Sequence, residues 1–216
     1  MLRLVRPLER RCSMDYVTFS HQFAEEVLET PARKPYRDDI FEVITSITDA
    51  DLIAEYGKVN EMSLSKAINL LLKERLVKRG WHAESPIFQT DAYSKGRWRL
   101  DFAKGKVSIE VAFNHGEAVA WNLLKPVLAS QLNHIEKAIT TEVGVIICAT
   151  RALRKAGLFD NTVGDYEKFK TYLRPLQAIL PTPILLIGLE PPKSFEVIGT
   201  KINSKTRGAV QMFENY

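Results

Sequence analysis

The chain is poor in the residues that build disulfide frameworks and zinc sites. Its 216 residues include two cysteines, Cys12 and Cys148, and four histidines. Two thiols are too few for a disulfide framework or for a zinc site made of four thiolates. The histidines His82, His115 and His134 stand alone, without the spacing of a zinc-binding motif. We therefore expect no structural zinc and a reducing, cytoplasmic location.

Long apolar runs and several catalytic signatures are also missing. The longest apolar stretches are residues 143–149 and 184–189, far short of the roughly 20 residues that cross a membrane. We therefore expect a soluble protein without a membrane partner. The chain has no glycine-rich phosphate-binding signature, no G-x-S-x-G elbow and no Ser/His/Asp order. These absences disfavour nucleotide kinases and hydrolases of those folds.

What the chain does have is a core-forming composition with a slight excess of positive charge. Of its residues 45% are hydrophobic, and 30 Lys and Arg outnumber 26 Asp and Glu. This length and composition predict one globular domain, which we place at residues 15–192. We expect the Arg-rich residues 1–14 to be an extension outside it, with Met14 as an alternative start. Residues 193–216 are expected to form a basic, loosely ordered tail.

Helices are predicted where apolar residues recur every three or four positions. This spacing is found at residues 21–30, in two short stretches within 38–56, and at 63–79, 117–139 and 165–180. Pro126 should kink the helix at 117–139 or divide it in two.

Strands are predicted by two other patterns. Strict alternation of apolar and polar residues marks 107–113, which follows a shorter candidate strand at 98–102 and a turn at 103–106. Continuous apolar runs at 143–149 and 184–189 indicate strands covered on both sides. The order of elements predicts an α/β domain of three layers, with a central mixed β-sheet flanked by helices.

Two acidic residues of the predicted hairpin are the main candidates for a functional site. If the apolar side chains of 107–113 pack into the core, Glu110 points to the other face, beside Asp101 of the first strand. Converging carboxylates suit Mg²⁺, which binds one or two carboxylates together with water and substrate phosphates. Such an ion lowers the pKa of a bound water. On the alternation alone, acids on the solvated face of an ordinary sheet are the simpler interpretation.

The same acids stand in short motifs with a defined spacing. Leu100-Asp101-Phe102 is followed by Ile109-Glu110-Val111-Ala112-Phe113, with eight residues between the acids. This arrangement resembles the metal-binding core of the BglII restriction endonucleases, a family of the PD-(D/E)xK nuclease superfamily. The resemblance covers most of the chain, from about Tyr16 to Pro192, and includes a helix that contains Asn69 and the strand that ends at Leu189. It implies a three-layer restriction-endonuclease-like domain.

The resemblance also implies a ligand set and partners. Asp101 and Glu110 would be the principal Mg²⁺ ligands, and Glu84 falls where relatives carry a further active-site side chain. The family implies a homodimer that grips double-stranded DNA and cuts both strands of a short palindromic site. A DNA methyltransferase acting on the same site is the partner expected for such an enzyme.

The chain departs from the family at one position. Relatives place Gln or Lys two residues after the second acid, where this chain has Ala112, which cannot hydrogen-bond a water. Either another group takes this role or cleavage is weak or absent. Asn114 is the first candidate for a catalytic replacement, and Lys104, Lys106 and His115 are the others.

Positive residues surround Asp101. They are Lys95, Arg97, Arg99, Lys104 and Lys106. Such a group is commonly a solvated surface, but beside a metal site we expect these side chains to bind DNA phosphates. His115, which adjoins the site strand, is a further candidate for DNA contact.

Three functions remain open on the sequence. The first is a Mg²⁺-dependent type II restriction endonuclease that hydrolyses phosphodiester bonds. Because of Ala112, the second is a DNA-binding protein that keeps the nuclease fold without turnover. The third is a nuclease for modified or branched DNA.

Overall fold

A six-stranded mixed sheet forms the centre of the computed structural model, which describes residues 12–59, 61–90, 93, 98–130, 138–202 and 205–214. The strand order is β1-β6-β5-β4-β3-β2. The strands are β1 (Tyr16–His21), β2 (His82–Pro86), β3 (Arg99–Lys104), β4 (Val107–Val111), β5 (Val143–Ala149) and β6 (Ile184–Leu189). Strands β4, β5 and β6 are mutually parallel, and the other three pair antiparallel with their neighbours. The predicted mixed sheet is confirmed.

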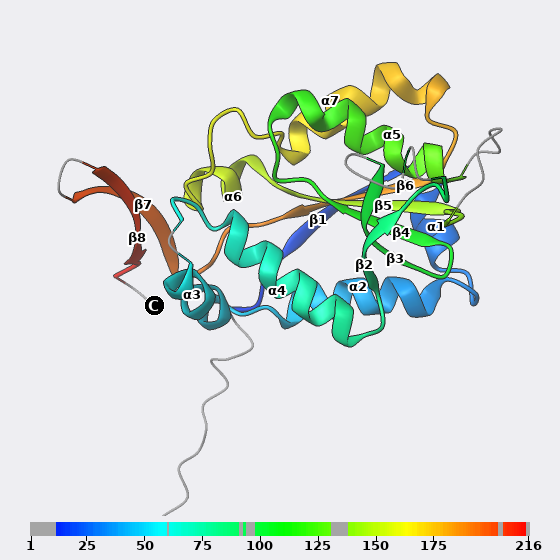
Figure 1. Ribbon diagram of the computed structural model, residues 1–216. Helices are drawn as coiled ribbons and strands as arrows, with labels where there is room; N and C mark the ends of the chain where they lie inside the picture. The colour runs from blue at the N-terminus through cyan, green and yellow to red at the C-terminus, as the bar shows by residue number, and fades with distance from the viewer. Residues whose placement is uncertain are drawn as a thin grey trace, which may run out of the picture.

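Helices cover both faces of this sheet. They are α1 (Ala24–Leu28), α2 (Lys34–Ser46), α3 (Asp49–Lys58), α4 (Ser65–Lys78), α5 (Val119–Ser130), α6 (Arg151–Ala156) and α7 (Tyr166–Leu176), with 3₁₀ turns η3 (Gly116–Ala118) and η4 (Gln177–Ile179). Helices α2, α3 and α4 lie against one face, and α5 and α7 against the other (Figure 1). The predicted three layers are therefore confirmed. None of the helices in the described part of the chain has the length and apolar character needed to span a membrane.

The two faces of β5 show how the layers are held together. Val145 and Ile147 belong to the apolar cluster on the side of α2 and α4, and Ile146 and Cys148 to the cluster with α5 and α7. All seven residues of β5 are buried. The continuous apolar run is thus explained by burial on two faces, which strengthens the hydrophobic core in proportion to the area covered.

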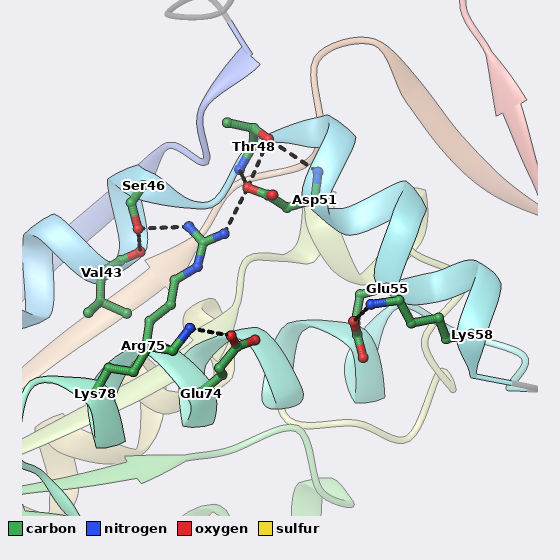
Figure 2. A network of polar contacts seen from close by, with 9 residues as sticks. All are labelled: Val43, Ser46, Thr48, Asp51, Glu55, Lys58, Glu74, Arg75 and Lys78. Carbon is green, nitrogen blue, oxygen red and sulfur yellow. Dashed lines mark hydrogen bonds and ion pairs between the residues drawn. The ribbon is translucent and has the colours of Figure 1, made fainter.

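A polar network joins α2, α3 and α4 on the surface of one layer (Figure 2). Thr48 caps α3, because its side chain accepts from the Asp51 N–H at 3.1 Å while Asp51 accepts from the Thr48 N–H at 2.9 Å. Arg75 of α4 lies 2.8 Å from Asp51 and donates to Ser46 of α2 at 2.8 Å. This cap divides residues 38–56 into two helices, as predicted.

The predicted helix at 21–30 is wrong in its first half. Residues 16–21 form the edge strand β1, antiparallel to β6, and helix α1 is short. Gln22 and Phe23 separate the two elements with φ of 53° and 58°. The Ser20 hydroxyl accepts from the Glu25 N–H in the first turn of α1 at 3.0 Å, but it does so from the end of β1, because Phe23 occupies the N-cap position.

The expectation of a loosely ordered C-terminal tail is also wrong. Strands β7 (Phe195–Ile202) and β8 (Lys205–Met212) form an antiparallel hairpin that extends from one end of the domain (Figure 1). Phe195 and Val197 are buried in the main core. The carboxylate of Asp49, which is 3% exposed, accepts hydrogen bonds from the Lys193 N–H at 3.0 Å and the Ser194 N–H at 2.8 Å. Asp49 therefore fastens the start of the hairpin to α3.

We expect Asp49→Ala to lower the free energy of unfolding by about 2–4 kcal/mol, because it leaves buried N–H and hydroxyl donors without an acceptor. Chemical denaturation monitored by circular dichroism measures this change. Asp38→Ala, which removes an exposed ion pair with Arg37, is the matched control and should cost well under about 1 kcal/mol. Equal effects of the two substitutions would contradict the anchoring role of Asp49.

Candidate active site

Strands β3 and β4 bring Asp101 and Glu110 together. The register pairs Phe102 with Ile109, so the two acids lie next to each other across the hairpin. The Asp101 N–H donates to Glu110 Oε1 at 3.3 Å, and the Val111 N–H donates to Asp101 Oδ2 at 2.7 Å. Each carboxylate is thus held by the backbone of the other strand.

The face that carries Glu110 is buried, in contrast to the expected solvated face. Glu110 is 2% exposed, and neighbouring Ser108 and Ala112 are also buried, because α5 covers this side of β4. Burial, followed by repulsion from Asp101, raises the pKa of Glu110 to about 8. Burial, together with the nearby charge of Glu84, also raises the pKa of Asp101. A positive charge near the two carboxylates would therefore stabilise their ionised forms.

Lys125 of α5 supplies part of that charge. Its Nζ lies 2.5 Å from Glu110 Oε2, and its side chain is 12% exposed. The next residue, Pro126, packs against β5 so closely that a Cβ on Gly144 would lie 2.5 Å from the proline Cβ. This close approach brings α5 down onto the sheet beside Glu110. Lys125 was not among the predicted site residues, because it lies outside the strand motif and the helix predicted at 117–139 contains other charged residues.

Glu84 approaches the pair from β2. It lies between the Ala83–Phe102 and Ser85–Leu100 pairs, with φ of 52°, a conformation that non-glycine residues rarely adopt. Backbone strain of this kind is concentrated at functional sites. Glu84 and Asp101 line one small cavity, which they share with Asn69 and Lys73 of α4. The structure therefore places the other two predicted acids on either side of Asp101, Glu110 on β4 and Glu84 on β2.

Two of the side chains predicted to replace Ala112, Asn114 and His115, lie beyond the end of β4. Strand β4 ends at Val111, so Asn114 does not continue its face and is exposed in the following loop. His115 is also exposed, and its side chain accepts from the Glu117 N–H at the start of η3.

The predicted phosphate-binding residues are separated from the acids or otherwise engaged. Lys104 donates to Asp39 at 2.8 Å, and Lys106 donates to Glu142 at 2.6 Å, both at the far end of the hairpin. Arg99 is half-buried at the start of β3. Lys95 and Arg97 lie outside the described residues.

The donor set fits a hard divalent cation with few protein ligands. Within the described residues, no group of three or more His, Cys, Asp or Glu side chains is placed to hold a metal. Two adjacent carboxylates are nevertheless what Mg²⁺ commonly uses, since it retains waters and takes its other ligands from substrate phosphates. The raised pKa values of Asp101 and Glu110 reflect an acidic pair that a cation would stabilise.

Solved structures that resemble this fold are of restriction endonucleases. The chain is similar to a crystal structure of restriction endonuclease BglII complexed with a DNA 16-mer, with a TM-score of 0.63 and 18% identity. It is also similar to free BglII, with a TM-score of 0.52 and 18% identity. Both comparisons cover 93% of this chain and 100% of the other. The layered sheet is thus the restriction endonuclease fold.

The sequence comparison defines the family. The model of the restriction endonuclease BglII/BglIII family matches residues 16–189, and the chain therefore belongs to that family. It is a type II restriction endonuclease, a class of endodeoxyribonuclease, and the resemblance found in its motifs is confirmed. A comparison with curated protein sequences gives no match.

We expect Asp101→Asn to stabilise the metal-free protein. The amide keeps an acceptor for the Val111 N–H but removes a buried charge next to Glu110. At about pH 8, relief of this charge should raise the free energy of unfolding by about 1 kcal/mol. Differential scanning calorimetry in the presence of a chelator measures the gain. A lower melting temperature than wild type would show that the pair is not in electrostatic conflict.

Proposed function

We propose that the chain hydrolyses phosphodiester bonds in double-stranded DNA with Mg²⁺ held by Asp101 and Glu110. Glu84 completes the acidic surface around this ion. The observation that carries the proposal is the pairing of the half-buried Asp101 with the buried Glu110, each carboxylate accepting a hydrogen bond from the backbone of the opposite strand. Buried acids without a bound cation are costly, so their retention in this place indicates a function.

The reaction adds water across one P–O bond. A water oxygen bonds to phosphorus, the P–O bond to one deoxyribose breaks, and the released oxygen takes a proton, leaving a phosphate end and a hydroxyl end. Bound Mg²⁺ would acidify the water and offset negative charge on the phosphate. Asp101 and Glu110 hold the reacting centre at one position, because each is fixed by the backbone of the opposite strand.

Double-stranded DNA is the substrate that the family comparison supports. The related BglII structure is a complex with a DNA 16-mer. Two copies of this chain would form a homodimer and cut the two strands of a short palindrome, because two-fold protein symmetry matches two-fold sequence symmetry. A cytoplasmic enzyme of this kind would be accompanied by a methyltransferase that protects the same site.

Ala112 is the observation that favours a second candidate function, DNA binding without cleavage. The residue is 2% exposed and packs in the apolar cluster beneath α5, so it offers the site no polar group. Retarded but uncut DNA over a range of Mg²⁺ concentrations would favour this alternative.

We expect Glu110→Gln to abolish Mg²⁺-dependent cleavage while the fold is retained, because the substitution removes one ligand charge without changing side-chain size. Plasmid digestion followed by mapping of the fragment ends measures cleavage, and circular dichroism measures folding. Glu29→Gln, at an exposed ion pair with Arg37, is the control and should cut like wild type. Full cleavage by Glu110→Gln would overturn the assignment of the site.

A further inference from the structure

Within the part of the chain that the structure describes, Lys125 makes a direct contact with the acidic pair. Lys125 Nζ is 2.5 Å from Glu110 Oε2, and the charge of Lys125 lowers the pKa of Asp101 as well. Lys73, on the opposite helix α4, also lowers the pKa of Asp101, but it is exposed on its helix. Lys125 is therefore the cation held most firmly at the pair.

The position of Lys125 is fixed by packing on both sides of it. Leu123 and Val127 belong to the apolar cluster between α5 and the sheet, and Pro126 lies directly over Gly144. A long side chain anchored this way loses little further freedom when it binds. Its ammonium group is preorganised beside the carboxylates.

Lys125 is also accessible from the surface. It lines a hollow together with Asn114, His115, Trp121 and Asn122. The ammonium is therefore held between this hollow and Glu110, whereas Asp101 and Glu84 line a separate cavity on the side of α4. Among the cations that the sequence analysis considered as replacements, Lys104 and Lys106 are held by Asp39 and Glu142 instead.

Fold stability alone gives a weak reason for this contact. A buried ion pair commonly adds little net stability, because the desolvation of both charges offsets their attraction. An apolar residue at position 125 would suit a helix whose remaining residues carry no charge. A preorganised positive charge at a reacting phosphate, in contrast, is worth a large rate factor.

We infer that Lys125 is the catalytic cation of this site, delivered from α5 in place of the strand side chain that Ala112 lacks. The inference rests on the proposed function. Lys125 stabilises the negative charge that develops on the phosphate oxygens as water bonds to phosphorus and the P–O bond breaks. Glu110 and Asp101 hold the other side of the reacting group.

A catalytic role and a structural role of Lys125 predict different changes in cleavage rate and metal affinity when the lysine is replaced. Lys125→Met should slow Mg²⁺-dependent cleavage by about 100-fold or more, since it removes a charge that acts in the transition state. The same substitution should strengthen Mn²⁺ binding in the absence of DNA several-fold, because the ammonium no longer competes for Glu110. Single-turnover cleavage and isothermal titration calorimetry measure the two quantities. Lys193→Met, which removes a lysine paired with Asp15 at 2.8 Å, is the matched control and should change neither.

A second variant, Lys125→Gln, keeps the catalytic role testable if Lys125→Met does not fold. Lys125→Gln keeps a hydrogen-bond donor for Glu110 but carries no charge, and it should slow cleavage at least about ten-fold with DNA binding in Ca²⁺ retained. A parallel fall of cleavage, Mn²⁺ affinity and melting temperature would overturn the catalytic role and leave a structural one. Cleavage by a folded Lys125→Met at the wild-type rate would also overturn it, without touching the proposed function. If wild type itself fails to cut any DNA with Mg²⁺, the proposed function falls and the role of Lys125 falls with it.

Discussion

The contact between Asp101 and Glu110 is the constraint around which this molecule is arranged. Two carboxylates placed side by side in a largely buried position repel each other, and burial raises the pKa of both. Such a pair is tolerated only where the surrounding structure holds it, here through hydrogen bonds from the backbone of β3 and β4. The layered core supplies that rigidity, because the parallel strands β4, β5 and β6 are fastened in the centre of the sheet.

The site depends on the two layers of helices in different ways. Helix α4, on one face, lines the cavity that exposes Asp101 and Glu84. Helix α5, on the other face, closes over Glu110 and brings Lys125 to it. Asp101 is therefore open to the cavity on the side of α4, whereas Glu110 is buried and paired with Lys125 on the side of α5. A sheet with one open face would leave Glu110 solvated and its pKa ordinary.

The parts of the fold that follow local rules were predictable. The strands predicted from continuous apolar runs have the same bounds as β5 and β6. Both faces of these strands are buried, so the apolar run begins and ends with the strand. The division between α2 and α3 follows from the cap at Thr48. Strand β1 was missed because its partner β6 lies some 170 residues away. Strands β7 and β8 pair with each other as a local hairpin, and they were missed because the basic residues of this segment were interpreted as a tail. Asp101 and Glu110 were found because alternation places them on one face, whereas the bent backbone at Glu84 carries no local signal.

The position of Lys125 beside Glu110 could not be predicted from the strand motif. A strand motif predicts side chains two residues apart on one face, and Ala112 breaks that pattern. The chemistry, however, requires a charge at a point in space and is indifferent to which element carries it. Because Gly144 has no side chain, Pro126 packs closely against β5. Helix α5 therefore lies near enough to the sheet for Lys125 to contact Glu110. The small residue in the sheet and the proline in the helix therefore allow the helix layer to place a charged side chain beside Glu110. An apolar residue at position 112 suits this arrangement, because Ala112 packs against the apolar side chains of α5.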